Sequence, residues 1–179
     1  SKGAFGKADI VADVTYINGE EQERTVISSV TLSDPVVETR ARGTKVRPTW
    51  YPTGSFRWPC SGRITSRFGY RNTGIRGATR NHKGIDIACA RGTPIYAADG
   101  GRVIFSGYKG AMGYVVIIDH NNGYVTYYEH NGSLLVSAGQ TVYKGQQIAR
   151  MGSTGVSSGN HCHFGILING TFVNPLNYL

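Results

Sequence analysis

Residues 114–130 read YVVIIDHNNGYVTYYEH, and this stretch decides the fold class. Its first five residues form the longest uninterrupted apolar run of the chain, and Asn121-Asn122-Gly123 follows three residues later. An apolar run, an Asn-Gly turn sequence and a second run rich in Tyr, Val and Thr are typical of two antiparallel strands joined by a tight turn. The stretch therefore predicts a β-hairpin with strands at 114–120 and 123–130.

The same alternation of short runs and turns continues on both sides of this hairpin, from Trp58 to the end of the chain. No stretch has the 3.6-residue periodicity of an amphipathic helix. Glycine makes up 25 of the 179 residues, about twice its usual share, which suits many tight turns. We predict one mainly antiparallel, all-β domain over residues 58–179. Its further candidate strands are 62–68, 84–88, 94–98, 101–106, 147–151, 162–168 and 171–173.

The N-terminal part of the chain predicts a separate, small β module over residues 1–47. Alternating residues from Asp9 to Tyr16 indicate a strand, Asn18-Gly19 indicates a tight turn, and further β-rich runs follow at 24–32 and 36–42. Residues 48–57 contain prolines that cannot donate to a β-ladder, so we predict a linker there.

Charge is distributed unevenly between these parts. Residues 1–47 carry seven basic and seven acidic residues, whereas residues 48–179 carry twelve basic and four acidic ones, which accounts for the whole net charge of +8. Such a surface attracts polyanions, either nucleic acid or an anionic cell wall. No apolar run approaches the roughly 20 residues that span a bilayer, so we expect no membrane span. The first residues contain no hydrophobic signal region.

Three cysteines, Cys60, Cys89 and Cys162, leave at least one free thiol in any disulfide arrangement. No C-x-x-C spacing occurs. Two interpretations stay open: three small buried apolar side chains, or a Cys60–Cys89 disulfide.

Two groups of polar residues have the spacing of a metal site. His82 and Asp86 differ by an even number, but a fully extended strand would separate their Cα atoms by about 13 Å, so the chain must bend near Gly84 for both to bind one ion. His161 and His163 lie on one strand face, and the residue between them points to the other. Two histidines and one carboxylate that leave a position for water form the ligand set of a catalytic zinc centre.

With these motifs in place, the chain from Arg63 to Leu179 resembles the lysostaphin/LytM-like family of zinc metallopeptidases that cut peptidoglycan peptides. The matching stretches occur in the family's order and cover nearly the whole second domain. They are Ile64-Thr65-Ser66-Arg67-Phe68-Gly69, His82-Lys83-Gly84-Ile85-Asp86-Ile87, Gly92-Thr93-Pro94-Ile95, Tyr127-Tyr128-Glu129-His130, Gly145-Gln146-Gln147-Ile148 and His161-Cys162-His163-Phe164.

This resemblance implies roles for five residues. His82, Asp86 and His163 would bind one zinc ion per chain, and His130 and His161 would be the catalytic pair. Zinc polarises a carbonyl and acidifies water, while imidazoles accept and donate the proton. No His-Glu-x-x-His motif is present, so histidine must replace the glutamate base of thermolysin-like enzymes.

Several other residues of this domain carry expectations of their own. By strand alternation Glu129 points away from the face of His130. His120 is assigned a structural or surface role. The glycine-rich loops 107–113 and 152–159 precede no helix, so we expect them to form groove walls or plain hairpin loops and not phosphate sites.

Residues 7–46 resemble part of the small wall-associated β module named for its five glycines, through Val14 to Glu20, Thr25-Val26 and Arg42 to Lys45. Together the resemblances imply a bacterial zinc endopeptidase that is extracellular, secreted or bound to the cell wall or surface. Its partners would be peptidoglycan peptides and the anionic wall, with no nucleic acid expected. The alternative is a catalytically silent wall-binding or regulatory protein on the same fold.

Overall fold

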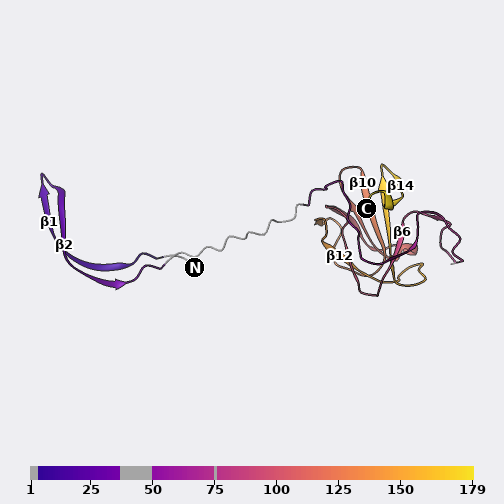
Figure 1. Cartoon of the computed structure of the whole chain (residues 1–179), viewed down its shortest axis with the longest axis horizontal. Coiled ribbons are helices and arrows are strands. Elements are labelled where there is room, and N and C mark those ends of the chain that lie inside the picture. Colours follow the sequence, from indigo (N-terminus) through magenta and orange to yellow (C-terminus); the bar gives the residue numbers. More distant parts are fainter. Residues whose placement is uncertain (1–3, 37–49, 75) are drawn as a thin grey trace. The chain divides into compact units, whose positions relative to one another are not determined.

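The computed structural model describes residues 4–36, 50–74 and 76–179. The chain divides into two compact units, Ser1–Val46 and Arg47–Leu179, which are coloured along the chain in Figure 1. Each unit is described by itself below. Both consist of β-structure, and every strand pair that the structure describes is antiparallel. The predicted all-β, mainly antiparallel fold class is confirmed.

The described residues of the first unit form a hairpin of β1 (Lys7–Ile17) and β2 (Glu20–Ser33). Asn18 and Gly19 join the strands with φ angles of 56° and 83°. Both angles are left-handed, as a two-residue turn that follows the strand twist requires. The predicted hairpin is thus confirmed, whereas the run expected at 36–42 lies outside the described residues apart from its first one.

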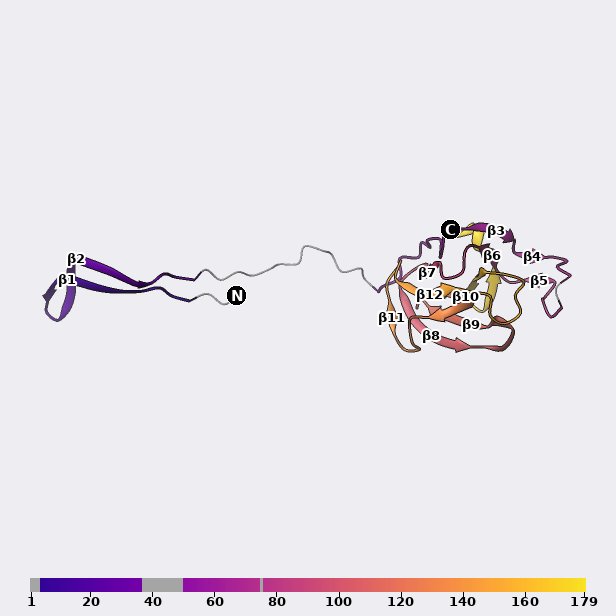
Figure 2. The same cartoon turned by 90° about the horizontal axis from the view of Figure 1, so that it is seen from below.

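The second unit contains a ten-stranded sheet and a separate pair of two-residue strands. Its main path runs β11-β8-β9-β10-β13-β6-β3, and Figure 2 shows β8, β9 and β10 as neighbours. The sheet strands are β3 (Arg63–Ser66), β6 (Ile85–Ala88), β7 (Pro94–Tyr96), β8 (Gly101–Tyr108), β9 (Tyr114–Asp119), β10 (Tyr124–Leu134), β11 (Thr141–Val142), β12 (Gln147–Met151), β13 (His161–Ile168) and β14 (Thr171–Val173).

Each strand predicted in the second unit is present, with ends that differ by a few residues. The hairpin predicted at 114–120 and 123–130 corresponds to β9 and β10. Its turn also contains left-handed residues, Asn121 at φ 54° and Gly123 at φ 85°. The sequence did not predict β4 (Gly69–Tyr70), β5 (Asn81–His82) or β11, because two residues show no alternation. The described helical segments are single 3-10 turns, η1 (Gly110–Met112) and η2 (Pro175–Asn177).

The core lies between the inward faces of these strands. Ile85 and Ile87 of β6 are fully buried, and Phe164 of β13 and Tyr128 of β10 pack in the same cluster. Burying aliphatic and aromatic side chains of this size contributes about 1.5–3 kcal/mol each. The strands that carry the polar residues of the site are therefore fixed from behind by the core.

All three cysteines are free thiols. Cys60 and Cys162 are buried in the core, while Cys89 is only partly buried against it. The Cys60–Cys89 disulfide considered from the sequence is therefore not formed, and the alternative of small apolar side chains describes Cys60 and Cys162. Burial raises the pKa of the Cys162 thiol, together with its hydrogen bond to Cys60.

The described part of the predicted linker, residues 50–57, lies within the second unit and packs against its other residues. The Thr53 amide donates to Asp99 Oδ2 at 2.8 Å, the Arg57 amide donates to the Ala98 carbonyl at 2.9 Å, and Phe56 is buried. Among the described residues no helix is long and apolar enough to cross a membrane.

Candidate metal centre and its pocket

Three polar side chains converge at the point where β5, β6 and β13 meet. His82 Nε2 lies 3.0 Å from Asp86 Oδ1, His163 Nδ1 lies 2.9 Å from the same oxygen, and the two nitrogens are 2.8 Å apart. All three residues are buried, and one ligand atom from each lies within 4.8 Å of the others. Two imidazole nitrogens and one carboxylate oxygen are a donor set that fits zinc.

The local chain path brings these residues together in the way the sequence required. β5 ends at His82 and β6 begins at Ile85, so the strand is interrupted at Lys83 and Gly84. Across the ladder, His163 of β13 is the direct partner of Asp86 on β6. The predicted bend near Gly84 is confirmed.

Gly84 also makes room for the ring of His163. A Cβ at this position would lie 2.4 Å from the Phe164 carbonyl oxygen and 2.7 Å from His163 Nε2, and both distances are too short for a side chain. The backbone of residue 84 therefore forms the surface against which the imidazole of His163 rests, and a glycine is needed there.

Hydrogen bonds fix which nitrogen of His82 can bind a metal. His82 Nδ1 donates to the carbonyl oxygen of Arg67 at 2.8 Å, so the neutral ring keeps the lone pair of Nε2 for the site. Burial by itself raises the pKa of Asp86. When His163 and His82 carry protons on the nitrogens that face it, their hydrogen bonds and charges outweigh burial and hold this pKa well below its usual range. Asp86 is therefore an anionic ligand at neutral pH.

Arg71 supports Asp86 from the other side, and the sequence analysis did not assign it a role. Its Nη1 donates to Asp86 Oδ2 at 2.7 Å and to Ser66 Oγ at 2.8 Å. The ion pair leaves Oδ1 free to face the two histidines. In the sequence Arg71 was one of many basic residues between Arg57 and Arg91, and nothing in its spacing relates it to Asp86.

The two remaining site histidines lie beside this centre. The ring centroids of His130 and His161 are 4.7 Å apart, and those of His130 and His163 are 6.2 Å apart. His161 Nε2 lies 3.7 Å from Asp86 Oδ1. The structure thus gathers all five residues that the sequence singled out, although they come from three distant segments of the chain.

Both of these histidines are oriented by backbone carbonyl groups. His130 Nδ1 donates to the Thr154 carbonyl at 2.8 Å, and His161 Nδ1 donates to the Gly159 carbonyl at 2.8 Å. The Nε2 atoms are therefore the ones that can exchange protons with a substrate. Burial lowers the pKa of His130 to about 4, and the neighbouring His161 and His163 contribute to the lowering. The ring of His130 is neutral at pH 7.

The expectation that Glu129 points away from the face of His130 is wrong. His130 has a left-handed φ of 63°, and the pairing of β10 with β9 shifts register between Tyr128 and Asn131. Such an irregularity interrupts the alternation of side chains along a strand. As a result Glu129 and His130 line the same pocket.

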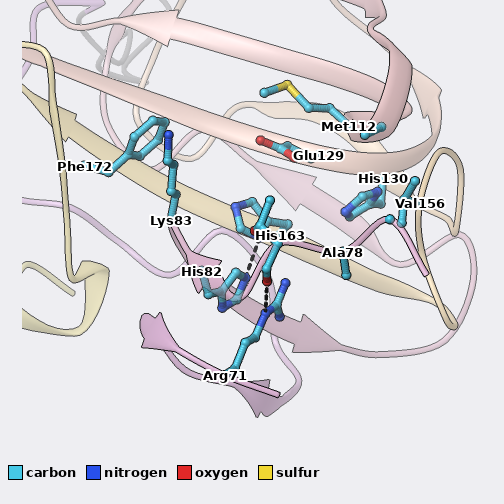
Figure 3. A pocket seen from close by; sticks show the side chains of 13 residues that line it. Arg71, Ala78, His82, Lys83, Met112, Glu129, His130, Val156, His163 and Phe172 are labelled. Carbon is cyan, nitrogen blue, oxygen red and sulfur yellow. Dashed lines mark hydrogen bonds between the residues drawn. The ribbon is translucent and has the colours of Figure 1, made fainter. Parts of the chain in front are cut away.

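This pocket has a volume of about 280 Å³, and His82 and His163 form part of its wall. In the view of Figure 3, Lys83 and Phe172 lie on one side of His163, and His130 and Val156 lie on the other. The metal centre is therefore accessible to a ligand from an open, largely apolar cavity.

The two glycine-rich loops, 107–113 and 152–159, contribute to the pocket wall. Of the two roles expected for them, the structure favours groove walls over plain hairpin loops. Ala111 and Met112 come from the first loop and Val156 from the second. The Val156 amide donates to the Ala111 carbonyl at 2.9 Å, which joins the loops. His120, in contrast, has a structural role, because it is fully buried and its Nδ1 donates to the Gly100 carbonyl at 2.7 Å.

An all-β domain that gathers two imidazoles and a carboxylate in a pocket, with two further imidazoles beside them, belongs to the class of metallopeptidase-like folds. Residues 80–175 match the model of peptidase family M23, and the chain belongs to this family. Residues 1–45 match the G5 domain model.

Similar proteins include both enzymes and activators. The chain is 38% identical over 176 residues to the murein hydrolase activator NlpD of Salmonella dublin, covering 97% of this chain and 44% of that protein. It is 44% identical over 114 residues to the DD-carboxypeptidase/endopeptidase Mpg of Neisseria meningitidis, covering 64% and 26%. The chain thus spans less than half the length of these relatives.

Among solved structures, the second unit is similar to the catalytic domain of the antimicrobial peptidase lysostaphin from Staphylococcus simulans. The TM-score is 0.61 at 28% sequence identity, and the match covers 65% of this chain and 91% of that domain. The likeness therefore extends over nearly the whole lysostaphin domain.

Proposed function

We propose that this chain is a zinc-dependent endopeptidase that hydrolyses peptide bonds in bacterial peptidoglycan, in stem peptides or cross-bridges. The observation that carries the proposal is the convergence of His82, Asp86 and His163 on one point, with the Nε2 atoms of His130 and His161 available beside it. A donor set without accessible proton-transfer groups would serve a structural metal equally well. Two further imidazoles at an open pocket favour catalysis.

In this proposal zinc, held by His82, Asp86 and His163, supplies Lewis acidity toward the scissile carbonyl and lowers the pKa of water. The other steps belong to the chain's own residues. His130 is neutral at pH 7, so its Nε2 can accept the proton of the attacking water. The Thr154 carbonyl holds its ring in the tautomer that leaves Nε2 unprotonated.

His161 has the complementary role. Its Nε2 lies 3.7 Å from Asp86 Oδ1 at the edge of the centre, and its Nδ1 is held by the Gly159 carbonyl, so this Nε2 can donate to the reacting carbonyl oxygen or to the leaving amine. Arg71 keeps Asp86 in position throughout, because it holds the oxygen that faces away from the histidines.

The peptidoglycan substrate and a place in the cell envelope are supported by the relatives and by charge. One of the named relatives is a murein hydrolase activator, and the other is a DD-carboxypeptidase/endopeptidase. Residues 48–179 carry the whole net charge of +8, which would hold the enzyme against an anionic wall. Gly77, Ala78 and Ala111 form part of the pocket wall, where a peptide backbone can approach closely.

We propose further that residues 1–47 form a wall-associated module, that residues 48–57 connect it to the catalytic part, and that residues 58–179 form the peptidase domain. The match of residues 1–45 to the G5 domain supports the first assignment.

The name of the Salmonella relative favours one alternative: a catalytically silent protein that binds the wall or regulates another hydrolase. This alternative does not require two accessible imidazoles beside the metal ligands. The presence of His130 and His161 in this geometry favours the enzyme.

Mass spectrometry of peptidoglycan tests the proposal directly. Purified peptidoglycans of several cross-link types are incubated with the zinc-loaded chain and, in parallel, with the His130→Ala variant. New peptide termini formed only by the wild type would support the endopeptidase and identify the bond. Full zinc occupancy without any cleavage would overturn the enzyme and favour the wall-binding alternative.

A further inference from the structure

Glu129 is a buried carboxylate that lines the pocket, and no residue in the described part of the chain forms a hydrogen bond or an ion pair with it. Its residue is only 8% exposed, and it belongs to the lining of the pocket beside His163. A buried charge is normally paired, so an unpaired one that faces a cavity indicates a ligand. A cation that enters the pocket would gain a charge-assisted interaction with this partly desolvated carboxylate.

Lys83 is one of the two Lys or Arg side chains in the described pocket lining, and its ammonium group lies over the ring of Phe172. Its Nζ lies 5.4 Å from the ring centroid of Phe172, and it forms no ion pair with Glu129. Arg71, the other cation that lines the pocket, is bound to Asp86. Neither side chain neutralises Glu129.

The pocket that Glu129 lines also has apolar walls. Ala111 and Met112 come from η1, and Phe172 comes from β14. Figure 3 shows Met112 and Glu129 close to each other on one side of the pocket. A carboxylate set between aliphatic and aromatic side chains fits a ligand with an alkyl chain that ends in an ammonium group.

We propose that Glu129, Met112 and Phe172 form a subsite that binds an alkylammonium side chain of the substrate, and that Glu129 determines this specificity. The inference rests on the proposed function, because it assigns a substrate class to the same pocket. It predicts that peptides carrying a free side-chain amine, such as that of a lysine or another diamino acid, are preferred over peptides in which the amine is acylated.

The test compares two synthetic peptides, Ala-γ-D-Glu-Lys-D-Ala-D-Ala and the same peptide with an Nε-acetylated lysine. Binding to the zinc-loaded full chain is measured calorimetrically in the His130→Ala background, so that the peptides stay intact. We expect the amine form to bind about tenfold more tightly or better, the range of one charge-assisted hydrogen bond in a partly buried site. Equal affinities would overturn the inference, and this comparison needs no change at Glu129.

Two variants in the same background assign the preference to one residue. Glu129→Gln should remove the preference by weakening only the binding of the amine form, with zinc content and far-UV circular dichroism unchanged. Lys83→Gln is the matched control and should keep the preference, because it removes a cation and not the carboxylate. A preference that survives Glu129→Gln, or one that disappears in Lys83→Gln, would overturn the inference.

Kinetics then separate binding from proton transfer and separate this inference from the proposed function. In a chain with His130 intact, Glu129→Gln should raise KM for the amine peptide and leave kcat nearly unchanged. A loss of kcat at constant KM would instead make Glu129 a proton-transfer group and overturn the subsite. Amine preference in binding without any cleavage would support the subsite and overturn the endopeptidase.

Discussion

His82 Nε2 lies 2.8 Å from His163 Nδ1, and both nitrogens contact the same oxygen of Asp86. Since His82 Nδ1 donates to the Arg67 carbonyl, the Nε2 atom of the neutral ring turns a lone pair toward the other two atoms. Three electron-rich atoms this close together need a shared proton or a cation between them. The arrangement explains why the site is suited to a divalent ion with nitrogen and oxygen ligands.

The first prediction separates metal binding from catalysis. His163→Ala should lose both zinc and peptidoglycan cleavage, because it removes one of three ligands. His130→Ala should keep one zinc per chain and lose about 10²–10⁴-fold in turnover, the range for a general base. Zinc is measured by elemental analysis after dialysis and cleavage by mass spectrometry. Undiminished zinc in His163→Ala would contradict the ligand assignment.

Arg71 gives the second prediction. Arg71→Gln should lower zinc affinity by about 10–100-fold, because residues that orient a ligand without touching the metal typically contribute this much. Competition with a coloured chelator measures the change. Arg67→Gln is the matched control, since residue 67 supplies only its backbone carbonyl to His82 and its exposed side chain makes no hydrogen bond among the described residues. Equal affinities of the two variants would show that the Arg71–Asp86 pair is not needed.

How much of this site is accessible from the sequence depends on the kind of interaction. Spacing singles out the candidate residues, because strand alternation places His161 and His163 on one face and the bend at Gly84 brings His82 toward Asp86. The division of these residues into ligands and a catalytic pair came from the family resemblance. The β9–β10 hairpin follows from its Asn-Gly turn. These are local rules, and they hold here.

Arg71 and Glu129 could not be placed in this way. Arg71 meets Asp86 across fifteen residues through a two-residue strand pair that leaves no pattern in the sequence. Glu129 turns into the pocket because His130 adopts a left-handed φ, and a non-glycine residue gives no advance sign of that conformation. The positions of these two side chains therefore depend on a long-range contact and on one backbone irregularity, and strand alternation predicts neither of them.

The third prediction concerns pH and the stability of the metal-free protein. The pKa of His130 is about 4 in the folded protein, against an ordinary value of 6.5, so between these values the unfolded chain binds a proton that the folded chain does not. The contribution of His130 to stability is thus complete above pH 6.5 and is lost as the pH falls toward 4, by up to about 3 kcal/mol.

Urea unfolding with chelator present, at several pH values between 4 and 7, measures this loss. The comparison is with His130→Gln, which keeps the size of the side chain and cannot titrate. His120, whose pKa is also lowered by burial, contributes equally to both proteins and cancels. Parallel stability curves for the two proteins over this range would contradict the assignment of a neutral, buried His130.

The last prediction uses the close approach of the backbone at residue 84. Gly84→Ala would place a methyl group 2.4 Å from the Phe164 carbonyl oxygen and 2.7 Å from His163 Nε2, and the first of these neighbours is backbone that cannot rotate away. The β6–β13 ladder must then separate where Asp86 pairs with His163. We expect a loss of about 1–3 kcal/mol in stability from the overpacking, and zinc affinity should fall with it because the ligands move apart.

Gly159→Ala is the control, since a Cβ there meets no atom within 4 Å and the carbonyl that orients His161 is retained. Thermal unfolding and zinc titration of both variants decide the point: a Gly84→Ala protein as stable and as tightly zinc-binding as Gly159→Ala would show that His163 does not depend on the backbone of residue 84.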